Sequence, residues 1–435
     1  MAGEERRQHA RFLAREFGRL DFGDVEERRG RHGEKLWGIE QFSMAMVAAA
    51  VSGQNGFRRM EKLTARLCQE FRRRLDIPHR LADTNARDYA AMADWSGYRD
   101  ALRKQAKSLY RSKAMVPAAD VPIGMISIDG KYRYVKVKKE RVGQYPFFQT
   151  KGQPDGDWQK GEVRTISASA VSSRATFTLD CIPVRRETNE MGMFPEVLSA
   201  LLADWGKTEL AELFATDAGS ASLANATMVN DAGHGYLMML NDFQPELLRE
   251  AERQLGRLPA VKAEATYQER YRGKEVVYRL WRTTEMAGWN GWEHLSQVIR
   301  LERRVLGAGP AGADKVGTRY ILTNLPVGRL SDDQWIVVIR RRWGVENGTH
   351  WTLDAIMDED DLPWILDPNG MIVVQLLRRI GLNIVALFRG VHLRSADNRL
   401  QPWNDIMEDF ADALKSAKAE ELMDLRELKR RAATA

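Results

Sequence analysis

The order of strands and helices between residues 125 and 240 constrains the fold of this 435-residue chain more than any other feature. A β-rich run over 125–129 resumes at 132–137, and an antiparallel pair is expected at 163–171 and 175–184. An amphipathic helix over 194–214, a strand over 213–216, a helix over 222–232 and a strand over 236–240 follow. This order predicts a mixed α/β sheet.

Three strands, a helix, a strand, a helix and a strand is the order of a ribonuclease-H-like core. A carboxylate closes the first strand at Asp129 and another closes the fourth at Asp217. We expect the two strand ends to be neighbours at the carboxyl edge of the sheet, where open α/β sheets bind their ligands.

A third acid lies in the stretch 341–360, RRWGVENGTHWTLDAIMDED. Arg342, Glu346 and His350 follow one another at intervals of four, which predicts that all three project from one helical face. Ile339 and Leu353 fall on that face too, so Glu346 is expected to point inward, where an acid needs a cation. A buried ion pair between Glu346 and Arg342 is the alternative to a bound metal ion.

Three converging carboxylates cannot all ionise without cations, and a ligand set made only of oxygen favours Mg²⁺ or Mn²⁺ over zinc. Two such ions, about 3.5–4 Å apart, activate a water or a 3′-hydroxyl and stabilise the leaving oxygen in phosphoryl transfer. Asp129, Asp217 and Glu346 are therefore the candidate catalytic residues and metal ligands. A zinc site on Glu346 and His350 is disfavoured because no Cys/His cluster accompanies them.

The basic residues are clustered, although the net charge is only +6. RRQHARFLAREFGRL, EERRGRHGEK, FRRRL, YRYVKVKKER and VIRRRW are local cationic blocks. Clusters of this kind favour a polyanionic partner such as nucleic acid over a merely solvated surface. The two cysteines cannot form a disulfide framework or a zinc site, and a charged N-terminus without an apolar signal core favours a cytoplasmic protein.

The pattern divides the chain into five parts. Residues 1–118 are expected to form an all-α domain for DNA binding or assembly, broken near residues 53–56 and 77–78. Residues 119–241 hold the first part of the core and 242–330 a β-rich insertion. Residues 331–390 hold the second part, with a capping box at Ser331 and Gln334 and an apolar helix from Asp367-Pro368 to about Arg389. Residues 391–435 are expected to form a C-terminal helical tail, charged and solvated over Met407–Ala435.

Several motifs together resemble the DDE transposases of bacterial insertion sequences. They are ISIDGK (126–131), ATDAGSAS (215–222), the stretch 341–360, and the apolar LLRRIGLNIVALFR. The similarity is greatest to the group in which a β-strand insertion separates the second Asp from the Glu-bearing helix. The segment LWGIEQFSMAMVAAAVSGQNGFRRMEKL and the turn ETNE (187–190) also resemble parts of that family.

The resemblance implies metal-dependent hydrolysis at transposon ends, followed by attack of the freed 3′-hydroxyl on DNA. It assigns metal binding to Asp129, Asp217 and Glu346, with Mg²⁺ as the cofactor (Mn²⁺ as a substitute) and two ions per site. Double-stranded DNA at transposon ends and in the target, and a homodimer in a synaptic complex, are the implied partners. The candidate DNA-binding residues are Arg342, Lys131, Asn347, His350 and Trp343.

Two departures from the family stand beside this resemblance. Ile339 and Leu353 occupy places where some relatives carry a Tyr and a Lys, and Tyr132-Arg133-Tyr134 replaces the usual threonine- and glycine-containing continuation after Asp129. A silent transposase-derived DNA-binding protein and a structure-specific nuclease remain alternatives.

Trp281, Trp289 and Trp292 either stack on an unpaired base or pack inside the insertion. Asp354, Asp358, Asp360 and Asp361 are expected to form a solvated acidic turn or to supply a fourth ligand.

Overall fold

A computed structural model describes residues 2–26, 37–271, 273–309, 312–360, 364–393, 395 and 398–422. The helices are α1 (Ala2–Phe17), α2 (Ile39–Val51), α3 (Phe57–Arg66), α4 (Gln69–Arg74), α5 (Asp83–Met92), α6 (Trp95–Arg111), α7 (Glu190–Trp205), α8 (Leu223–Asp231), α9 (Pro245–Leu255), α10 (Asp332–Arg342), α11 (Trp351–Ala355), α12 (Pro368–Leu387), α13 (Trp403–Ser416) and α14 (Ala419–Leu422).

The strands are β1 (Met125–Lys138), β2 (Phe148–Thr150), β3 (Trp158–Ala170), β4 (Phe177–Pro183), β5 (Leu213–Thr216), β6 (Gly235–Leu240), β7 (Ala265–Tyr271), β8 (Lys274–Thr283), β9 (Gln297–Val305) and β10 (Lys315–Thr323). They form one 10-stranded sheet in the order β2-β3-β1-β5-β6-β10-β9-β8-β7, with β4 also paired to β3. β1 is antiparallel to β3 and parallel to β5, and β5 is parallel to β6. The core order β4-β3-β1-β5-β6 confirms the predicted ribonuclease-H-like, mixed α/β fold.

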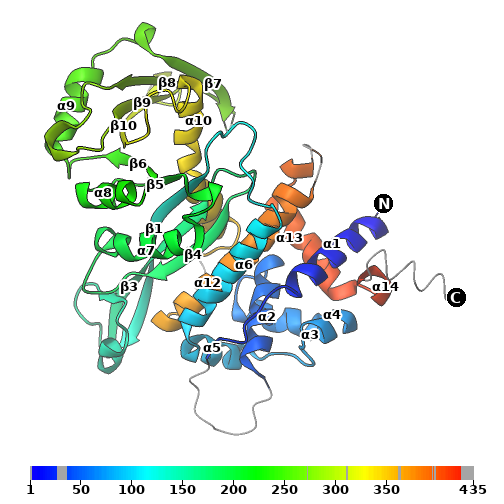
Figure 1. Cartoon of the computed structure of the whole chain (residues 1–435). Helices are drawn as coiled ribbons and strands as arrows, with labels where there is room; N and C mark the ends of the chain where they lie inside the picture. Colours follow the sequence, from blue (N-terminus) through cyan, green and yellow to red (C-terminus); the bar gives the residue numbers. More distant parts are fainter. Residues whose placement is uncertain are drawn as a thin grey trace.

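The insertion extends this same sheet. β10 pairs antiparallel with β6, and β9, β8 and β7 follow outward, so the insertion and the core share one continuous ladder. Figure 1 shows these strands with α9 and α10 at the end of the molecule away from the N-terminal helices. The helix α9 was not expected within a β-rich segment. Trp281 and Trp292 are buried, so both pack inside the insertion.

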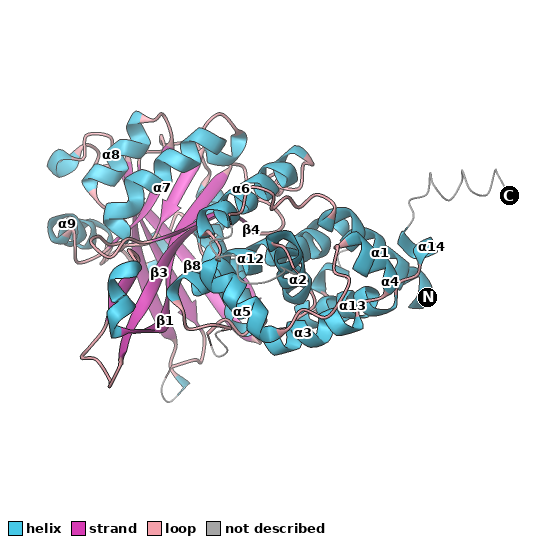
Figure 2. Cartoon of the chain, turned by 90° about the horizontal axis from the view of Figure 1, so that it is seen from below, coloured by secondary structure: helices cyan, strands magenta, loops and turns pink. Residues whose placement is uncertain are grey.

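The apolar helix α12 organises the interior. It is buried along its whole length and packs on α2, α5 and α6 as well as on β1, β3 and β4. The stretch 368–392 is long and apolar enough to cross a membrane, but its apolar window is entirely buried inside the protein, as in a core helix. The N-terminal helices and the sheet therefore share one hydrophobic core. Figure 2 shows α1, α3, α4, α13 and α14 beyond α12, away from the sheet.

Several helix boundaries follow from capping residues. The Asp94 side chain accepts a hydrogen bond from the Ser96 amide at the start of α6, and Asp367 does the same for Gly370 at the start of α12. The predicted capping box of Ser331 and Gln334 is present at α10. Asn189 caps α7, which starts at Glu190, four residues before the predicted start of that helix.

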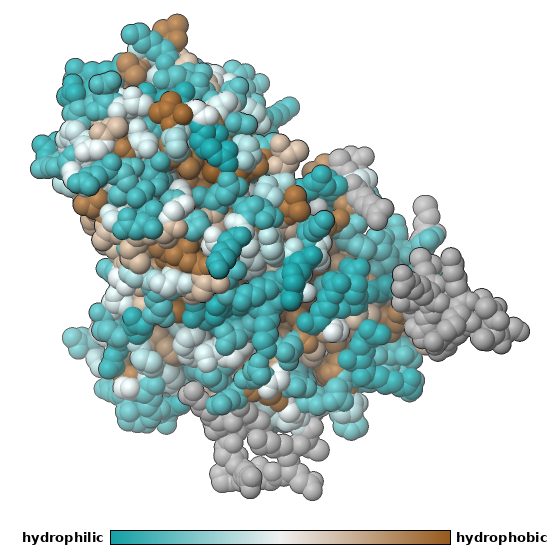
Figure 3. Space-filling view, viewed as in Figure 1, coloured by the Kyte–Doolittle hydropathy of each residue, from teal (hydrophilic) through white to brown (hydrophobic). Residues whose placement is uncertain are grey.

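The C-terminal tail is less solvated than expected. Ile406, Met407 and Phe410 form a buried face of α13, which packs against α1. The tail beyond Leu422 and most of the basic block at 26–35 lie outside the described residues. The face shown in Figure 3 is mostly hydrophilic, with hydrophobic residues in small scattered groups.

Candidate active site

Asp129 and Asp217 lie on neighbouring strands at the same sheet edge. The parallel pairing of β1 with β5 ends at Ile128 and Thr216, and each aspartate is the next residue along the chain. The Ser220 amide donates a hydrogen bond to Asp217 Oδ1 at 3.2 Å, which fixes this carboxylate in the turn before α8. The expected juxtaposition of the two aspartates is therefore present.

Asp129 does not end its strand, as the sequence suggested. β1 continues to Lys138 because its pairing with β3 runs uninterrupted to Trp158. The edge arises instead because β5 stops at Thr216. Asp129 thus lies inside a long strand, at the point where its neighbour on one side ends.

Two hydrogen bonds fix the end of α10 to this edge. The Ser127 hydroxyl on β1 donates to the Arg342 carbonyl at 2.9 Å, and Arg342 Nε donates to the Thr216 carbonyl at 3.0 Å. Arg342 Nη1 lies 3.2 Å from Glu346 Oε1. The ion pair considered from the sequence is therefore present, but it is one-sided: Arg342 is buried whereas the Glu346 side chain is 43% exposed. Arg342 is placed to position Glu346.

The stretch after Arg342 is not one regular helix, which corrects the predicted spacing. α10 ends at Arg342, residues Val345–His350 form a π-helical turn, and α11 starts at Trp351. The wider turn changes the angular positions of residues four apart, and such turns are frequent at functional sites. Gly344 and Gly348 let the turn approach Val171 and Thr176, where a Cβ would lie 3.1 Å and 2.8 Å from the nearest side-chain atoms.

His350 still reaches the site through this turn. Its Nδ1 lies 3.1 Å from Asp129 Oδ2, and both side chains are largely buried. Trp343 is half-buried, with the Arg342 guanidinium 5.5 Å from its ring centroid. Asn347 belongs to the turn, but its side chain lies outside the described residues.

Glu190 is a fourth acid at this edge, and it is not among the site residues predicted from the sequence. It is the first residue of α7, and its carboxylate lies over Gly130, where an added Cβ would be 2.2 Å from the carboxyl carbon. A side chain at position 130 would therefore displace the Glu190 carboxylate from this place. The pKa of Glu190 is raised to about 7, first by burial and then by the charges of Asp217 and Asp129, while Arg164 opposes them. The signal in the sequence was an acid one residue after the Asn189 cap.

The pKa values of two other acids of the site, Asp217 and Glu346, are also raised. Burial and then Asp129 raise the pKa of Asp217, although Arg342 opposes them. Burial also raises the pKa of Glu346, with Arg342 opposing and both aspartates contributing. The charge of Asp129 thus raises the pKa of Glu190, Asp217 and Glu346, which means that all four carboxylates lie close together.

These carboxylates suit a hard divalent cation, because all the donors are oxygen and a cation would relieve their repulsion. Their placement is not that of a closed metal site. Within the described residues, no three His, Cys, Asp or Glu side chains form a group that could hold an ion as they stand. His350 holds Asp129 and Arg342 holds Glu346, so an ion would have to compete with these contacts.

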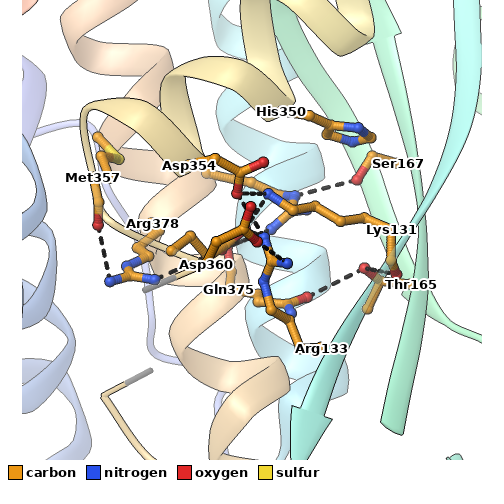
Figure 4. Close-up of polar contacts among 12 residues, drawn as sticks. Lys131, Arg133, Thr165, Ser167, His350, Asp354, Met357, Asp360, Gln375 and Arg378 are labelled. Atoms are coloured by element: carbon orange, nitrogen blue, oxygen red, sulfur yellow. Dashed lines mark hydrogen bonds and ion pairs between the residues drawn. The ribbon is translucent and has the colours of Figure 1, made fainter. Parts of the chain in front are cut away.

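Lys131, a candidate phosphate contact, is buried in a separate ion cluster (Figure 4). Its ammonium pairs with Asp354 and lies 2.8 Å from Glu359 Oε2. We call the following residues the Glu359 cluster: Lys131, Arg133, Asp354, Glu359, Asp360, Arg378 and Arg379. The expected solvated acidic turn is therefore wrong for Asp354, which pairs with Lys131 and Arg133. Asp360 is exposed, as expected, although it pairs with Arg133, and Asp361 lies outside the described residues.

No protein-family model matches the chain. Two curated relatives from Escherichia coli strain K12, "H repeat-associated putative transposase YhhI" and "Putative protein YbfL", are each 25% identical over 242 residues. Each match covers 53% of this chain and 60% of the relative. A solved structure of a piggyBac transposase synaptic complex with hairpin DNA matches with 10% identity and a TM-score of 0.42, over 98% of this chain and 84% of that chain.

The chain thus spans less than two thirds of the length of its curated relatives. The strand order establishes the ribonuclease-H-like core. Together with that core, the similarity to a relative named as a transposase confirms the predicted resemblance to transposases of the ribonuclease-H-like type.

Proposed function

We propose that this chain is a DNA transposase that cleaves and joins DNA strands at the inverted-repeat ends of an insertion sequence, using divalent metal ions. The observation that carries the proposal is that Asp129 and Asp217 each follow the last pair of the β1–β5 ladder, while Glu346, in the π-helical turn after α10, is close enough for both aspartates to raise its pKa. The transposase relative supports the same reaction class.

Asp129, Asp217 and Glu346 would hold Mg²⁺ or Mn²⁺. When bound, these ions supply activation of a water or a 3′-hydroxyl and stabilisation of the leaving oxygen. The chain's own residues position the acids: Arg342 holds Glu346 while its Nε stays on the Thr216 carbonyl, and His350 holds Asp129. Both contacts keep mutually repelling carboxylates at one edge of the sheet.

The proposal includes double-stranded transposon ends and target DNA as substrates, a homodimer in the synaptic complex, and a cytoplasmic, nucleoid-associated location. A silent transposase-derived DNA-binding protein is the second candidate. It is favoured by the finding that, in the part of the chain that is described, the acids do not form a ready group for an ion.

Strand cleavage tests the proposal. A plasmid carrying the DNA that flanks the reading frame on both sides is incubated with the full chain and Mg²⁺ or Mn²⁺. We expect nicking and joined products, and we expect Asp129→Ala, Asp217→Ala and Glu346→Ala each to lose them by about a thousandfold or more, since metal assistance is worth several kcal/mol. Glu408→Ala, an exposed acid on α13, is the control.

Cleavage that survives in all three alanine variants would refute the assignment. Binding of the flanking DNA without any cleavage would favour the silent DNA-binding protein. Cut strands without joined or hairpin products would favour a structure-specific nuclease.

A further inference from the structure

The outer half of β1 carries an exposed face that the site described above does not use. Along residues 132–138 the even-numbered side chains are exposed, whereas Lys131, Val135 and Val137 are buried. The exposed residues are Tyr132, Tyr134, Lys136 and Lys138. Only Ile128 and the residues before it pair with β5, so this part of β1 has β3 as its strand partner.

β3 adds basic and aromatic residues to the same face, together with the buried acid Glu162 opposite Tyr134. Tyr132 lies opposite Arg164, Lys136 opposite Lys160, and Lys138 opposite Trp158. We call these residues the β1–β3 ladder: Tyr132, Tyr134, Lys136, Lys138, Trp158, Lys160 and Arg164. Figure 1 shows β1 and β3 running together away from the insertion.

The aromatic rings of the ladder are presented to solvent. Tyr132 is 51% exposed, Tyr134 67% and Trp158 41%. The two tyrosine rings lie edge to face with centroids 5.6 Å apart, and the Lys136 ammonium lies 5.0 Å from the Trp158 ring centroid. Single exposed aromatic residues are common, but three on one face among four cations form a surface for stacking bases.

The charge of the ladder is positive. Within the described residues, neither Lys136 nor Lys138 pairs with a carboxylate. Lys160 is 3.1 Å from the exposed Asp155, and Arg164 is 2.6 Å from the buried Glu162, which also pairs with Lys151. The ladder ends at a hollow of about 480 Å³ lined by further basic and aromatic residues, among them Arg87, Arg141 and Trp364.

The ladder begins at the acidic site. Gly130, which faces the Glu190 carboxylate, precedes Tyr132 on the same side of β1, and Arg164 acts electrostatically on Glu190. From Gly130 to Lys138 the strand extends about 27 Å at about 3.3–3.4 Å per residue. By the same alternation Asp129 lies on the opposite side of β1, with Lys131, so it is Glu190 that connects the acidic site to the ladder. A DNA strand running from Glu190 along this face would meet the rings first and the lysines next.

We propose that the β1–β3 ladder binds an unpaired DNA strand next to the phosphodiester held at the acidic site, stacking bases on Tyr132, Tyr134 and Trp158 and pairing phosphates with Lys136 and Lys138. The inference rests on the proposed function for the identity of its ligand. A sheet face with rings and cations fits a single strand, because unpaired bases expose the π-faces that a duplex hides.

Binding is measured by fluorescence anisotropy of the full chain with a labelled 20-nucleotide strand of mixed sequence and with the same sequence as a blunt duplex, in EDTA. We expect tighter binding to the single strand. Tyr132→Ala/Tyr134→Ala should weaken it by at least about 30-fold, given about 1–3 kcal/mol for each stacked base. Tyr132→Phe/Tyr134→Phe keeps both rings and should stay within about threefold of wild type, because stacking needs the ring and not the hydroxyl.

The lysines are tested by salt dependence. Lys136→Gln/Lys138→Gln should flatten the slope of log K against log salt by about 1.4, at about 0.7 for each phosphate contact on a single strand. Val261→Ala and Lys207→Gln, both exposed outside the ladder, are the matched controls and should leave affinity and slope unchanged. Thermal melts of each variant verify folding.

Equal losses in the controls, an unchanged affinity in the tyrosine-to-alanine variant, or a loss confined to the duplex would overturn the inference. Cleavage of the plasmid in Mg²⁺ by the wild-type chain is measured in parallel. Cleavage with an inert ladder would leave the proposed function intact and refute the ladder; a ladder that binds as expected in a chain that never cuts would refute only the proposed function.

Discussion

Residues of strand β1 belong to two groups of acids, and the two groups differ in how many cationic side chains neutralise them. Asp129 belongs to the candidate active site, whereas Lys131 and Arg133, two and four residues later, belong to the Glu359 cluster. In the cluster, burial acts to raise the pKa of Glu359, but Lys131, Arg379, Arg133 and Arg378 hold that pKa well below its usual range. In the active site the pKa of Asp217, Glu190 and Glu346 is raised.

The comparison shows how Glu359 differs from the candidate catalytic acids. The Glu359 carboxylate is 1% exposed and forms ion pairs with basic side chains of both β1 and α12. These ion pairs join the sheet to the core helix. Among the described residues, the four active-site carboxylates form ion pairs with one guanidinium, that of Arg342, and one imidazole, that of His350. Unbalanced, partly buried negative charge lowers stability and is typical of sites that bind an ion or a substrate.

The largest expected effect is on the cluster. Glu359→Ala should lower the free energy of unfolding by about 3–5 kcal/mol, because it leaves buried cations on Arg378 and Arg379 without a counter-charge. Urea denaturation followed by tryptophan fluorescence measures the change, with Glu408→Ala as the exposed control. A loss no larger than that of the control would mean that the cluster does not hold β1 to α12.

In the active site, removing an acid should not lower the stability of the metal-free chain, and stability should depend on metal. Asp217→Asn should leave the metal-free chain as stable as wild type or more so, because it removes a repelling charge. Mg²⁺ at about 100 times its dissociation constant should stabilise wild type by about 2.7 kcal/mol and the variant much less. Urea denaturation with EDTA and with Mg²⁺ measures both effects. Equal stabilisation of the two proteins would place the ion elsewhere.

The sequence predicted the elements that depend on local signals. The strand order, the end of β5 at Thr216 before Asp217, and the cap at Ser331 follow from period and capping chemistry. The sequence also identified Asp129, Asp217 and Glu346 as candidate site residues. The two aspartates were expected to be neighbours because strand ends in this order share an edge of the sheet.

The remaining features depend on tertiary contacts. Asp129-Gly130 has the residues of a turn, yet Gly130 lies inside β1 and provides space for Glu190. The π-helical turn at Val345–His350 follows from close packing of Gly344 and Gly348 on the β3–β4 connection, which no periodicity reports. Lys131 is assigned to the Glu359 cluster only by partners more than 200 residues away in sequence, such as Asp354.

The smallest expected effect is a pH dependence of stability in the metal-free chain. The folded pKa of Glu190, about 7, lies above its usual value, so the folded state holds this proton more tightly than the unfolded state does. Stability is therefore full below about pH 4.5 and is lost as pH rises toward 7. The pKa values of Asp217 and Glu346 are raised too and add to this loss.

Glu190→Gln removes the largest of these pKa shifts, so the melting temperature of this variant in EDTA should fall less than that of wild type between pH 5 and pH 8. Saturating Mg²⁺ should reduce the difference between the two proteins, because a bound cation favours the ionised carboxylates. An unchanged pH profile in the variant would mean that Glu190 is not one of the charged groups that oppose one another at this edge.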